Sequence, residues 1–359
     1  MLDPSVPPFH TAPQHGPRPL PLFLDMLRNE TAASPERRAA ALAGLRAYQD
    51  APRGRTRRLA PARFRKGRAR LRDYSAKGSH GRAVIVIPSL INPAFILDLM
   101  SGNSLIQWLA DQGFRPFLLD WGTPDPAERD MDVTAHVEQL LLPLIAKFEE
   151  PPVLAGYCLG GTIALAAACA VPVAGLAMIA APWRFSGFGD AARGDIAELW
   201  RAAQPACEAM GLVPMEVLQT GFWRLDPART IAKYEAFAAM EPGGATARSF
   251  VAMEDWANAG APLPYAAGRQ MFDDFIEADL PGSGRWRVGG AIADPAQLAC
   301  PAVDFVSMTD RIVPARSAAD LPDRRDLGAG HVGMIVGRGG RSQLWEPLAD
   351  WLSAIPGTR

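Results

Sequence analysis

The sequence predicts an α/β fold in which a doubly wound, mostly parallel sheet carries a helical cap insertion. Two observations support this prediction. Short apolar runs such as residues 83–87 alternate along the chain with segments of helical pattern, which is typical of parallel sheets. Between about residues 183 and 297 the alternation stops, and helical segments and loops occur there with five tryptophans. A chain of 359 residues is long enough for one large α/β domain with such an insertion.

The predicted elements follow a regular order. Apolar runs indicate strands at residues 83–87, 114–119, 153–156, 173–179 and 302–306. Helices of the core are expected at residues 104–112, 133–148, 162–170 and 342–355. Helices of the insertion are expected at residues 195–203, 214–221, 227–240 and 266–276. We therefore divide the chain into a first core part, a cap and a second core part, at residues 61–182, 183–297 and 298–359.

Residues 1–60 form a Pro- and Arg-rich segment that precedes the predicted core. The first 21 residues contain seven prolines, so we expect them to be extended or poorly ordered. A helix is predicted from Ser34 to Tyr48, because Ser34 supplies a capping hydroxyl and Pro35 occupies the first helical position.

A strongly basic stretch spans residues 53–72, with ten Arg or Lys residues and no acidic residue. One interpretation is a binding site for a polyanion. From Arg63 to Arg72, however, basic side chains alternate with small or apolar ones around a central Lys66–Gly67. Because such alternation is typical of strands with one solvent-exposed face, we favour a β-hairpin.

Composition excludes several classes of protein. The formal net charge of −1 gives no overall bias toward nucleic acid or an anionic membrane. The four cysteines are scattered, so we expect neither a metal site nor a disulfide framework, and the reducing cytoplasm fits best. No secretory signal is evident, and Pro172 interrupts the uncharged stretch at residues 163–181. We therefore predict no membrane span.

The sequence from Gly156 to Gly161, Gly-Tyr-Cys-Leu-Gly-Gly, follows a predicted strand and precedes a helix rich in small residues. This is the context of a nucleophile elbow, the sharp turn that presents the nucleophile in α/β-hydrolase folds, with Cys158 in the serine position. The turn also places Cys158 at a helix N-terminus, where the dipole favours a thiolate. The alternative is a small buried cysteine in a Gly-rich turn, which this context disfavours.

Two later residues complete a candidate catalytic triad. In this fold the acid and then the histidine follow the nucleophile, each after a later strand. Asp310 follows the predicted strand at residues 302–306, and His331 comes 21 residues after it. The other four histidines lie in the N-terminal region, before the sheet or at a helix start. Asp304 is an alternative acid, but it lies within the strand.

The predicted chemistry also requires donors to an oxyanion. One backbone N–H is expected from Leu159, directly after the nucleophile, and the other from Leu90 or Ile91 in the loop after the first core strand. Asp120, at the end of a strand, has either a catalytic or a bracing role, and we favour bracing.

Several motifs, in order, resemble those of polyhydroxyalkanoate synthases. The resemblance covers roughly residues 62–355 and rests on PSLIN at 88–92, FILDL at 95–99, DWG at 120–122 with Pro124–Asp125, GYCLGG at 156–161, TDRIVP at 309–314 and GHVG at 330–333. It implies an α/β-hydrolase fold, with Cys158 as the nucleophile, His331 as the base and Asp310 as its partner.

The resemblance further implies transfer of a 3-hydroxyacyl group from coenzyme A to the cysteine and then to a growing polyester chain. The coenzyme A thioester is then a substrate, and no tightly bound cofactor or metal is implied. The implied partners are a second synthase subunit or a second copy of the chain. The implied location is cytoplasmic, at the surface of polyester granules.

Two other functions remain open from the sequence. A hydrolase, such as a polyester depolymerase, thioesterase or esterase, would use the same three residues. A non-catalytic granule-binding scaffold is the third class, and the intact triad argues against it. The sequence does not fix the acyl chain length or the acceptor.

Overall fold

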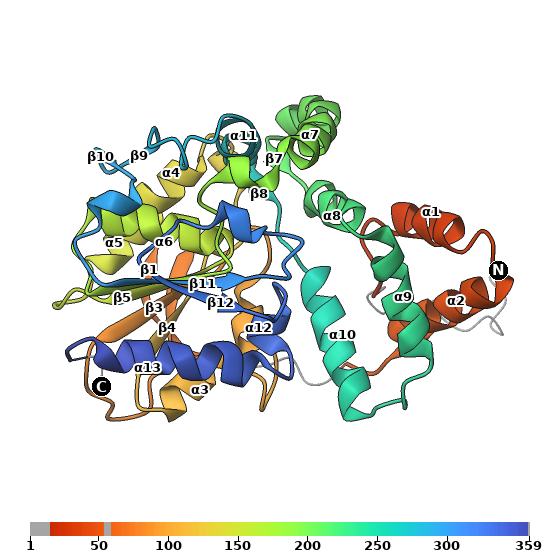
Figure 1. Cartoon of the computed structure of the whole chain (residues 1–359), viewed down its shortest axis with the longest axis horizontal. Coiled ribbons are helices and arrows are strands. Elements are labelled where there is room, and N and C mark those ends of the chain that lie inside the picture. Colours follow the sequence, from red (N-terminus) through yellow and green to blue (C-terminus); the bar gives the residue numbers. More distant parts are fainter. Residues whose placement is uncertain (1–14, 54–58, 358–359) are drawn as a thin grey trace, which may run out of the picture. The chain divides into compact units, whose positions relative to one another are not determined.

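The computed structural model describes residues 15–53 and 59–357. Its contacts divide the chain into two compact units. The smaller unit comprises Met1–Thr56 and Asp226–Asn258, and the larger unit comprises Arg57–Leu225 and Ala259–Arg359. Figure 1 labels the elements of both units.

An eight-stranded sheet forms the centre of the larger unit, in the order β1-β2-β4-β3-β5-β6-β11-β12. Its strands are β1 (Ala62–Lys66), β2 (Ala69–Asp73), β3 (Ala83–Ile87), β4 (Arg115–Asp120), β5 (Val153–Tyr157), β6 (Gly175–Ile179), β11 (Ala302–Ser307) and β12 (Asp323–Leu327). Neighbours from β4 to β12 are parallel, whereas β1 and β2 form a hairpin that joins β4 antiparallel. The predicted doubly wound sheet and the hairpin in the basic stretch are both confirmed.

The central strands β3, β5 and β6 are buried along their full length. Each predicted strand agrees with an observed one to within two residues at either end. The edge strand β12 was not predicted, because its sequence Asp-Arg-Arg-Asp-Leu is mostly charged and its first four residues alternate between partly buried and exposed. It pairs with β11 in parallel register.

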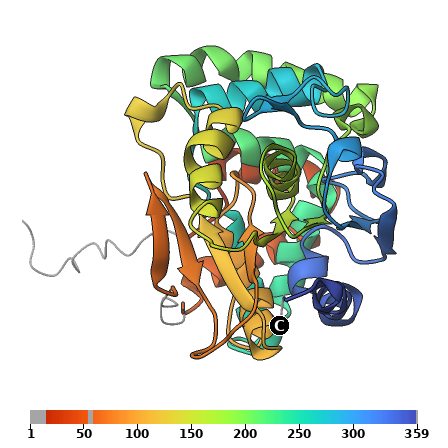
Figure 2. The same cartoon turned by 90° about the vertical axis from the view of Figure 1, so that its left-hand side faces the viewer.

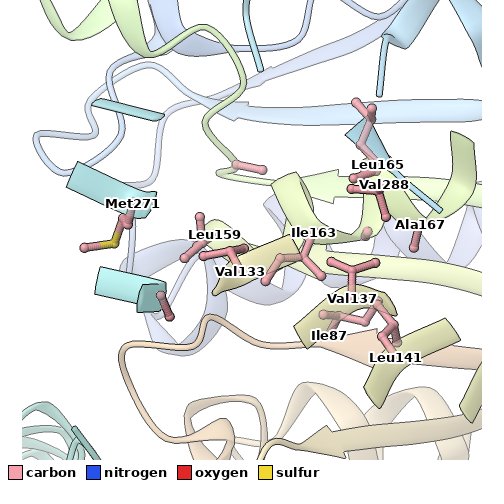
Figure 3. Close-up of a cluster of buried hydrophobic side chains, with 14 of the residues drawn as sticks. Ile87, Val133, Val137, Leu141, Leu159, Ile163, Leu165, Ala167, Met271 and Val288 are labelled. Atoms are coloured by element: carbon pink, nitrogen blue, oxygen red, sulfur yellow. The ribbon is translucent and has the colours of Figure 1, made fainter. Parts of the chain in front are cut away.

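Helices cover both faces of the sheet (Figure 1, Figure 2). One face carries α3 (Leu105–Asp111) and α13 (Glu346–Ala354), and the other carries α4 (Val133–Ala135), α5 (Leu142–Ile145) and α6 (Leu159–Ala170). The helix predicted over 133–148 is interrupted by a π-helical segment, His136–Leu141, between α4 and α5. Fully buried side chains such as Ile87, Val137 and Ile163 fill the space between this segment, α6 and the sheet (Figure 3).

The residues of the predicted cap, 183–297, divide between the two units. The larger unit holds α7 (Asp190–Met210), β7 (Leu212–Val213), α8 (Met215–Arg224), β8 (Leu263–Pro264), α11 (Tyr265–Arg269), the π-helical segment Gln270–Glu277, β9 (Arg287–Val288) and β10 (Ala291–Ile292). The smaller unit holds α9 (Pro227–Ala238) and α10 (Ala245–Ala257). These boundaries follow contacts and differ from those drawn at residues 61, 183 and 298. The role of the insertion as a cap stays a prediction.

Short elements complete the described chain. A one-turn helix, α12 (Gly333–Val336), and a π-helical segment, Arg341–Trp345, precede α13. Turns of 3₁₀ helix occur at Ala94–Asp98, Pro126–Glu128, Phe185–Phe188, Pro295–Gln297 and Ala315–Ser317. Among the described residues, no helix has both the length and the apolarity to cross a bilayer.

The smaller unit joins the N-terminal helices α1 (Leu20–Glu30) and α2 (Pro35–Asp50) to α9 and α10. The predicted helix after Ser34 is confirmed, and the Ser34 hydroxyl accepts from the Arg37 N–H at 3.2 Å. Helix α1 was not predicted, and its first two residues belong to the stretch 1–21 that was expected to be extended; Pro21 lies in the first turn, where proline is tolerated. Residues 1–14 of the predicted extended stretch lie outside the described residues.

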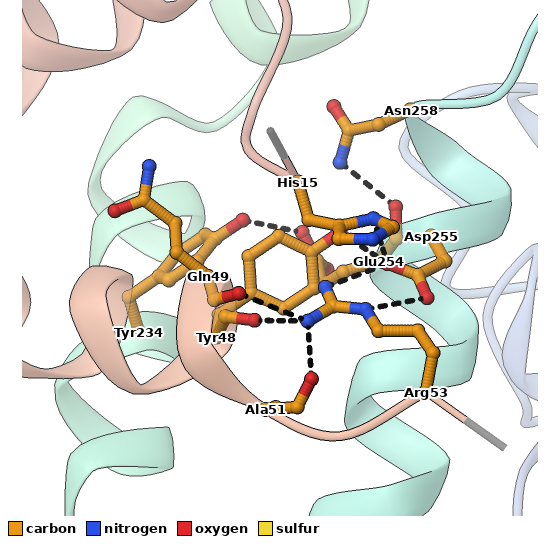
Figure 4. Close-up of polar contacts among 9 residues, drawn as sticks. All are labelled: His15, Tyr48, Gln49, Ala51, Arg53, Tyr234, Glu254, Asp255 and Asn258. Carbon is orange, nitrogen blue, oxygen red and sulfur yellow. Dashed lines mark hydrogen bonds and ion pairs between the residues drawn. The ribbon is translucent and has the colours of Figure 1, made fainter. Parts of the chain in front are cut away.

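The interior of the smaller unit contains charged groups that are paired with one another (Figure 4). The Tyr48 hydroxyl donates to Asp255 at 2.7 Å, and the Tyr234 hydroxyl donates to Glu254 at 2.9 Å. Asp255 also receives the Arg53 guanidinium, and Glu254 receives the Lys233 ammonium. We call this set the tyrosine–carboxylate cluster; its members are Tyr48, Arg53, Lys233, Tyr234, Glu254 and Asp255.

Candidate active site

Cys158 lies in a sharp turn between β5 and α6, so the predicted strand–turn–helix context is present. Its φ of 57° and ψ of −134° fall in a region used almost only by glycine, which costs other residues about 1–3 kcal/mol. The Cys158 N–H donates to the Ile179 carbonyl at 2.9 Å, and the Cys158 carbonyl accepts from Gly161 at 2.8 Å. These bonds hold the strained turn, with Cys158 at the N-terminus of α6.

The glycines of the elbow are required by close packing. A β-carbon at Gly160 would overlap the backbone of β3 at Ile87 and Pro88, and one at Gly156 would overlap the backbone of Gly160. A β-carbon at Gly161 would overlap the side chain of Ala181. Without side chains at these positions, α6 packs directly on the sheet and the cysteine is fixed at the edge where β3, β5 and β6 end.

The structure brings Asp310 and His331 together, as predicted. His331 Nδ1 lies 2.6 Å from Asp310 Oδ2, and both side chains are buried. The other oxygen, Asp310 Oδ1, accepts from the backbone N–H groups of Ile312 at 2.7 Å and Val313 at 3.0 Å. The carboxylate is therefore fixed by its own loop and orients the imidazole through Nδ1, which leaves Nε2 available for Cys158.

The charges of Cys158 and Asp310 both act on the imidazole of His331. Burial of His331 disfavours the charged imidazolium, but the Cys158 thiolate and the Asp310 carboxylate outweigh it and raise the pKa of His331. The raised pKa therefore favours the imidazolium form of His331, and an imidazolium beside a cysteine is the partner that cysteine enzymes use to activate the sulfur.

The predicted oxyanion donors differ in whether their N–H groups already have an acceptor. Leu159 is the first residue of α6, so its N–H has no acceptor one turn earlier in the helix. The Ile91 N–H donates instead to the Ser89 hydroxyl at 3.1 Å, which disfavours Ile91 as a donor to substrate. No partner for the Leu90 N–H occurs in the described parts of the chain, so Leu90 is the better candidate of the two.

Two other acids considered in the sequence have different surroundings. Asp304 accepts from the Ala319 N–H at 3.2 Å, and burial raises the pKa of Asp304 to about 7. Asp120 accepts two hydrogen bonds from Arg72, at 2.7 and 3.0 Å, and a third from the Gly122 N–H at 3.0 Å. Asp120 therefore braces its loop against the hairpin.

An apolar cavity of about 160 Å³ borders Cys158. Its walls come from α7, α8, the π-helical segment Gln270–Glu277 and the loop that follows Asp310. Besides Cys158, it is lined by Ile91, Leu159, Pro182, Phe185, Phe188, Ala192, Ile196, Leu199, Val217, Leu218, Gly221, Phe222, Leu225, Met271, Phe272, Ile276, Arg311, Ile312, Val313 and Pro314. Figure 3 includes Leu159 and Met271 from this lining. Arg311 is the only charged residue among these lining residues.

Three buried hydroxyls that position the site were not predicted. The Tyr157 hydroxyl donates to the His331 carbonyl at 3.2 Å, and the Ser307 hydroxyl donates to the Ala329 carbonyl at 2.5 Å. The third is Ser89, which holds Ile91. Tyr157 and Ser89 lie inside the quoted motifs, so the sequence marks their positions. It does not reveal their roles, because both hydroxyls bond to backbone groups, those of His331 and Ile91.

Comparison with known proteins gives several matches. A model of the alpha/beta hydrolase family matches residues 95–339. The poly(3-hydroxyalkanoate) polymerase subunit PhaC of Haloferax mediterranei is 25% identical over 308 residues, which are 81% of this chain and 63% of that protein. The subunit of the same name from Synechocystis sp. is 28% identical over 291 residues, which are 75% of this chain and 77% of that protein. The chain thus spans less than two thirds of the Haloferax relative. The resemblance to polyhydroxyalkanoate synthases is confirmed.

A solved structure supports the fold. An epoxide hydrolase of Bacillus megaterium in complex with an inhibitor has a TM-score of 0.52 at 14% sequence identity. The match covers 82% of this chain and 100% of that chain. At such low identity the likeness concerns the fold alone.

Proposed function

The chain belongs to the alpha/beta hydrolase family, and we propose that it is an acyltransferase of the polyhydroxyalkanoate synthase type. The proposed donor is a 3-hydroxyacyl-coenzyme A, and the proposed acceptor is the terminal hydroxyl of a growing polyester chain. The observation that carries this proposal is a cysteine, paired with a His331–Asp310 dyad, beside an apolar cavity. Similarity to poly(3-hydroxyalkanoate) polymerases over 81% of the chain supports it.

In the first half-reaction the Cys158 thiolate attacks the carbonyl carbon of the thioester. The resulting oxyanion accepts hydrogen bonds from the backbone N–H groups of Leu159 and Leu90. When the bond to the sulfur of coenzyme A breaks, the His331 imidazolium gives its proton to that sulfur. The products are an acyl-cysteine, free coenzyme A and a neutral His331.

In the second half-reaction the neutral imidazole of His331 accepts the proton of the acceptor hydroxyl. The oxygen attacks the acyl-cysteine, the bond to Cys158 breaks, and a new ester forms. The thiolate and the imidazolium are thereby restored. Asp310 keeps the imidazole oriented and stabilises its charged form in both halves of the cycle.

The choice of nucleophile and the cavity favour transfer over hydrolysis. A thiol that attacks a thioester exchanges one thioester for another, so the first step is close to neutral in free energy. The acyl-cysteine then retains enough energy to form an oxygen ester. An apolar cavity beside it excludes water, which would otherwise compete with the hydroxyl.

The proposal also includes a protein partner of the enzyme. Both similar polymerases described above are named as subunits. We therefore propose that a second subunit or a second copy of this chain completes the active enzyme, and that the polymer keeps it at the surface of a granule.

A direct test supplies the purified protein with 3-hydroxyacyl-coenzyme A of four to eight carbons. We expect a covalent acyl adduct on Cys158 by mass spectrometry, release of coenzyme A, and polymer rather than free acid. Added hydroxyacyl primer should shorten the lag before coenzyme A release. Stoichiometric free 3-hydroxy acid, unaffected by primer or by a candidate subunit, would instead identify a thioesterase. Cys158→Ala is the control that should form no adduct.

A further inference from the structure

The size of the apolar cavity indicates how much of an acyl group it can hold. Its volume is about 160 Å³, and apolar cavities of ~150 Å³ stay dry and bind molecules as large as benzene, which has six carbons. In a 3-hydroxyacyl group bound to Cys158, the carbonyl and the hydroxyl on the third carbon require polar partners. The substituent beyond the third carbon is apolar, so it is the part suited to the cavity.

A methyl substituent, as in a 3-hydroxybutyryl group, would leave most of this cavity empty. Side chains around an unfilled apolar space lose their contacts, because no atoms occupy the other side. Substituents of three to five carbons, including the terminal methyl, fit within the volume of the cavity. Each methylene group removed from water improves binding by about fourfold, which favours the longer substituent.

Gly221, on α8, lines the cavity and leaves its space unfilled because it has no side chain. It lies inside a helix, where glycine is less stable than alanine by roughly 0.5–1 kcal/mol. A β-carbon there would meet its nearest neighbour, Leu199 Cδ2, at 3.4 Å, which is ordinary contact. Unlike the glycines of the elbow, Gly221 is therefore not required by packing. It lines the cavity, and any larger side chain would occupy the space.

We propose that this cavity is a side-chain pocket for 3-hydroxyacyl groups with a substituent of three to five carbons on the third carbon, and that Gly221 determines this selectivity. The substrates are then 3-hydroxyhexanoyl to 3-hydroxyoctanoyl thioesters. This inference rests on the proposed function, since it takes Cys158 as the acylated residue.

The test measures the rate at which each 3-hydroxyacyl-coenzyme A acylates Cys158, by mass spectrometry in a single turnover without acceptor. The protein with Gly221 should be acylated at least tenfold faster by the octanoyl than by the butyryl substrate. Gly221→Leu should lose tenfold or more with the octanoyl substrate and change less than twofold with the butyryl substrate. Gly221→Ala, which suits a helix, should show a smaller loss of the same kind.

Gly194→Leu is the matched control, because Gly194 lies inside α7, does not line the cavity and has open space around it. We expect it to leave the order of substrates unchanged. Equal loss for all chain lengths in Gly221→Leu and Gly221→Ala, or no loss in either, would overturn the pocket assignment while the acyl-enzyme stands. A folded protein that no acyl-coenzyme A labels on Cys158 would overturn the proposed function, and the pocket assignment with it.

Discussion

Each unit of the molecule contains a group of wholly or partly buried charged side chains, and the two groups differ in what surrounds them. In the tyrosine–carboxylate cluster of the smaller unit, each Glu254 oxygen has a partner, Lys233 at 2.7 Å and Tyr234 at 2.9 Å. In the larger unit, Asp310 and His331 are also paired, at 2.6 Å, but next to them lies Cys158, whose backbone is strained and whose side chain borders a cavity.

This contrast separates buried charges that stabilise a fold from buried charges that take part in a reaction. Full pairing in a cluster that ends on tyrosines and partly buried cations is a way to stabilise a small helical unit. Pairing that ends on a strained nucleophile beside an unfilled apolar space prepares a group for reaction. Substitutions in the two groups should therefore have different consequences for activity and for stability.

Replacing the nucleophile should have the largest effect. Cys158→Ala should lower coenzyme A release by roughly 10⁴-fold or more, because no acyl-enzyme can form, while thermal unfolding is unchanged or occurs at higher temperature. Cys169→Ala on the same helix is the control, since burial raises the pKa of Cys169 and makes it a poor nucleophile. Iodoacetamide should label Cys158 before Cys169. Full activity in Cys158→Ala would contradict the proposed mechanism.

Asp310→Asn should lower the rate of acylation by about 10²–10⁴-fold, because the imidazole loses its orientation and its negative partner. The Asp310 carboxylate helps to raise the pKa of His331, so its loss destabilises the imidazolium. The pKa of His331, followed by the NMR shifts of its imidazole against pH, should therefore fall in the variant. An unchanged pKa would show that Asp310 does not act on the imidazole.

Asp304→Asn should change stability and not chemistry. In the folded state the pKa of Asp304 is raised to about 7 by burial, so its contribution to stability is present at pH 4 and is lost as the pH rises through 7. The asparagine carries no charge, so the variant should not lose this stability. At pH 8 its free energy of unfolding should exceed that of the original protein by up to roughly 4 kcal/mol. Urea unfolding at pH 5 and pH 8 measures it. A drop in acylation of more than a few fold would place Asp304 in the site.

The smallest effect is expected in the smaller unit. Glu254→Gln should reduce the free energy of unfolding by about 1–3 kcal/mol, because Lys233 and Tyr234 lose a charged partner. Glu235→Gln, which breaks the more exposed pair with Arg37, should cost less than about 1 kcal/mol. Neither variant should alter the rate of Cys158 acylation by more than twofold. A selective rate loss in Glu254→Gln would remove the contrast between the two groups.

The sequence predicted the apolar centre of the fold better than its edges. Strands such as β3 are covered by helices on both faces, so their apolar runs are unambiguous. The strand β12 has one covered edge and pairs Arg324 with Asp326 and Arg325 with Asp323 along its own surface. A charged sequence of this kind does not indicate a strand. β12 is a strand because it pairs with β11, and that contact cannot be predicted from local sequence.

Helix boundaries were lost where the backbone departs from regular geometry. The π-helical segment His136–Leu141 has the same apolar spacing as the helix around it, so periodicity cannot reveal it. Helix α10 carries the buried Phe250 and Trp256, but Glu254 is buried with them, and its partners come from α9. Helix α10 was not predicted, because a glutamate on its buried face hides the amphipathic pattern until those partners are known.

For the candidate site, the order of motifs was enough to choose Cys158, Asp310 and His331, because the elbow and the strand ends have strict local signatures. The cavity was not predictable, since its walls come from separate helices. The choice between Leu90 and Ile91 depended on the Ser89 hydroxyl, whose direction is not encoded in spacing. Local chemistry could thus be predicted, and assembled surfaces could not.

The backbone of Cys158 has a consequence for how this protein changes over time. Glycine is the residue that best tolerates a φ of 57° with a ψ of −134°, so it would relax the turn. A glycine has no sulfur, and the substitution that suits the chain best would be catalytically silent. Random change filtered only for folding should therefore tend to lose the nucleophile at position 158. A reactive residue that persists there against this bias must be maintained by selection for what the protein does.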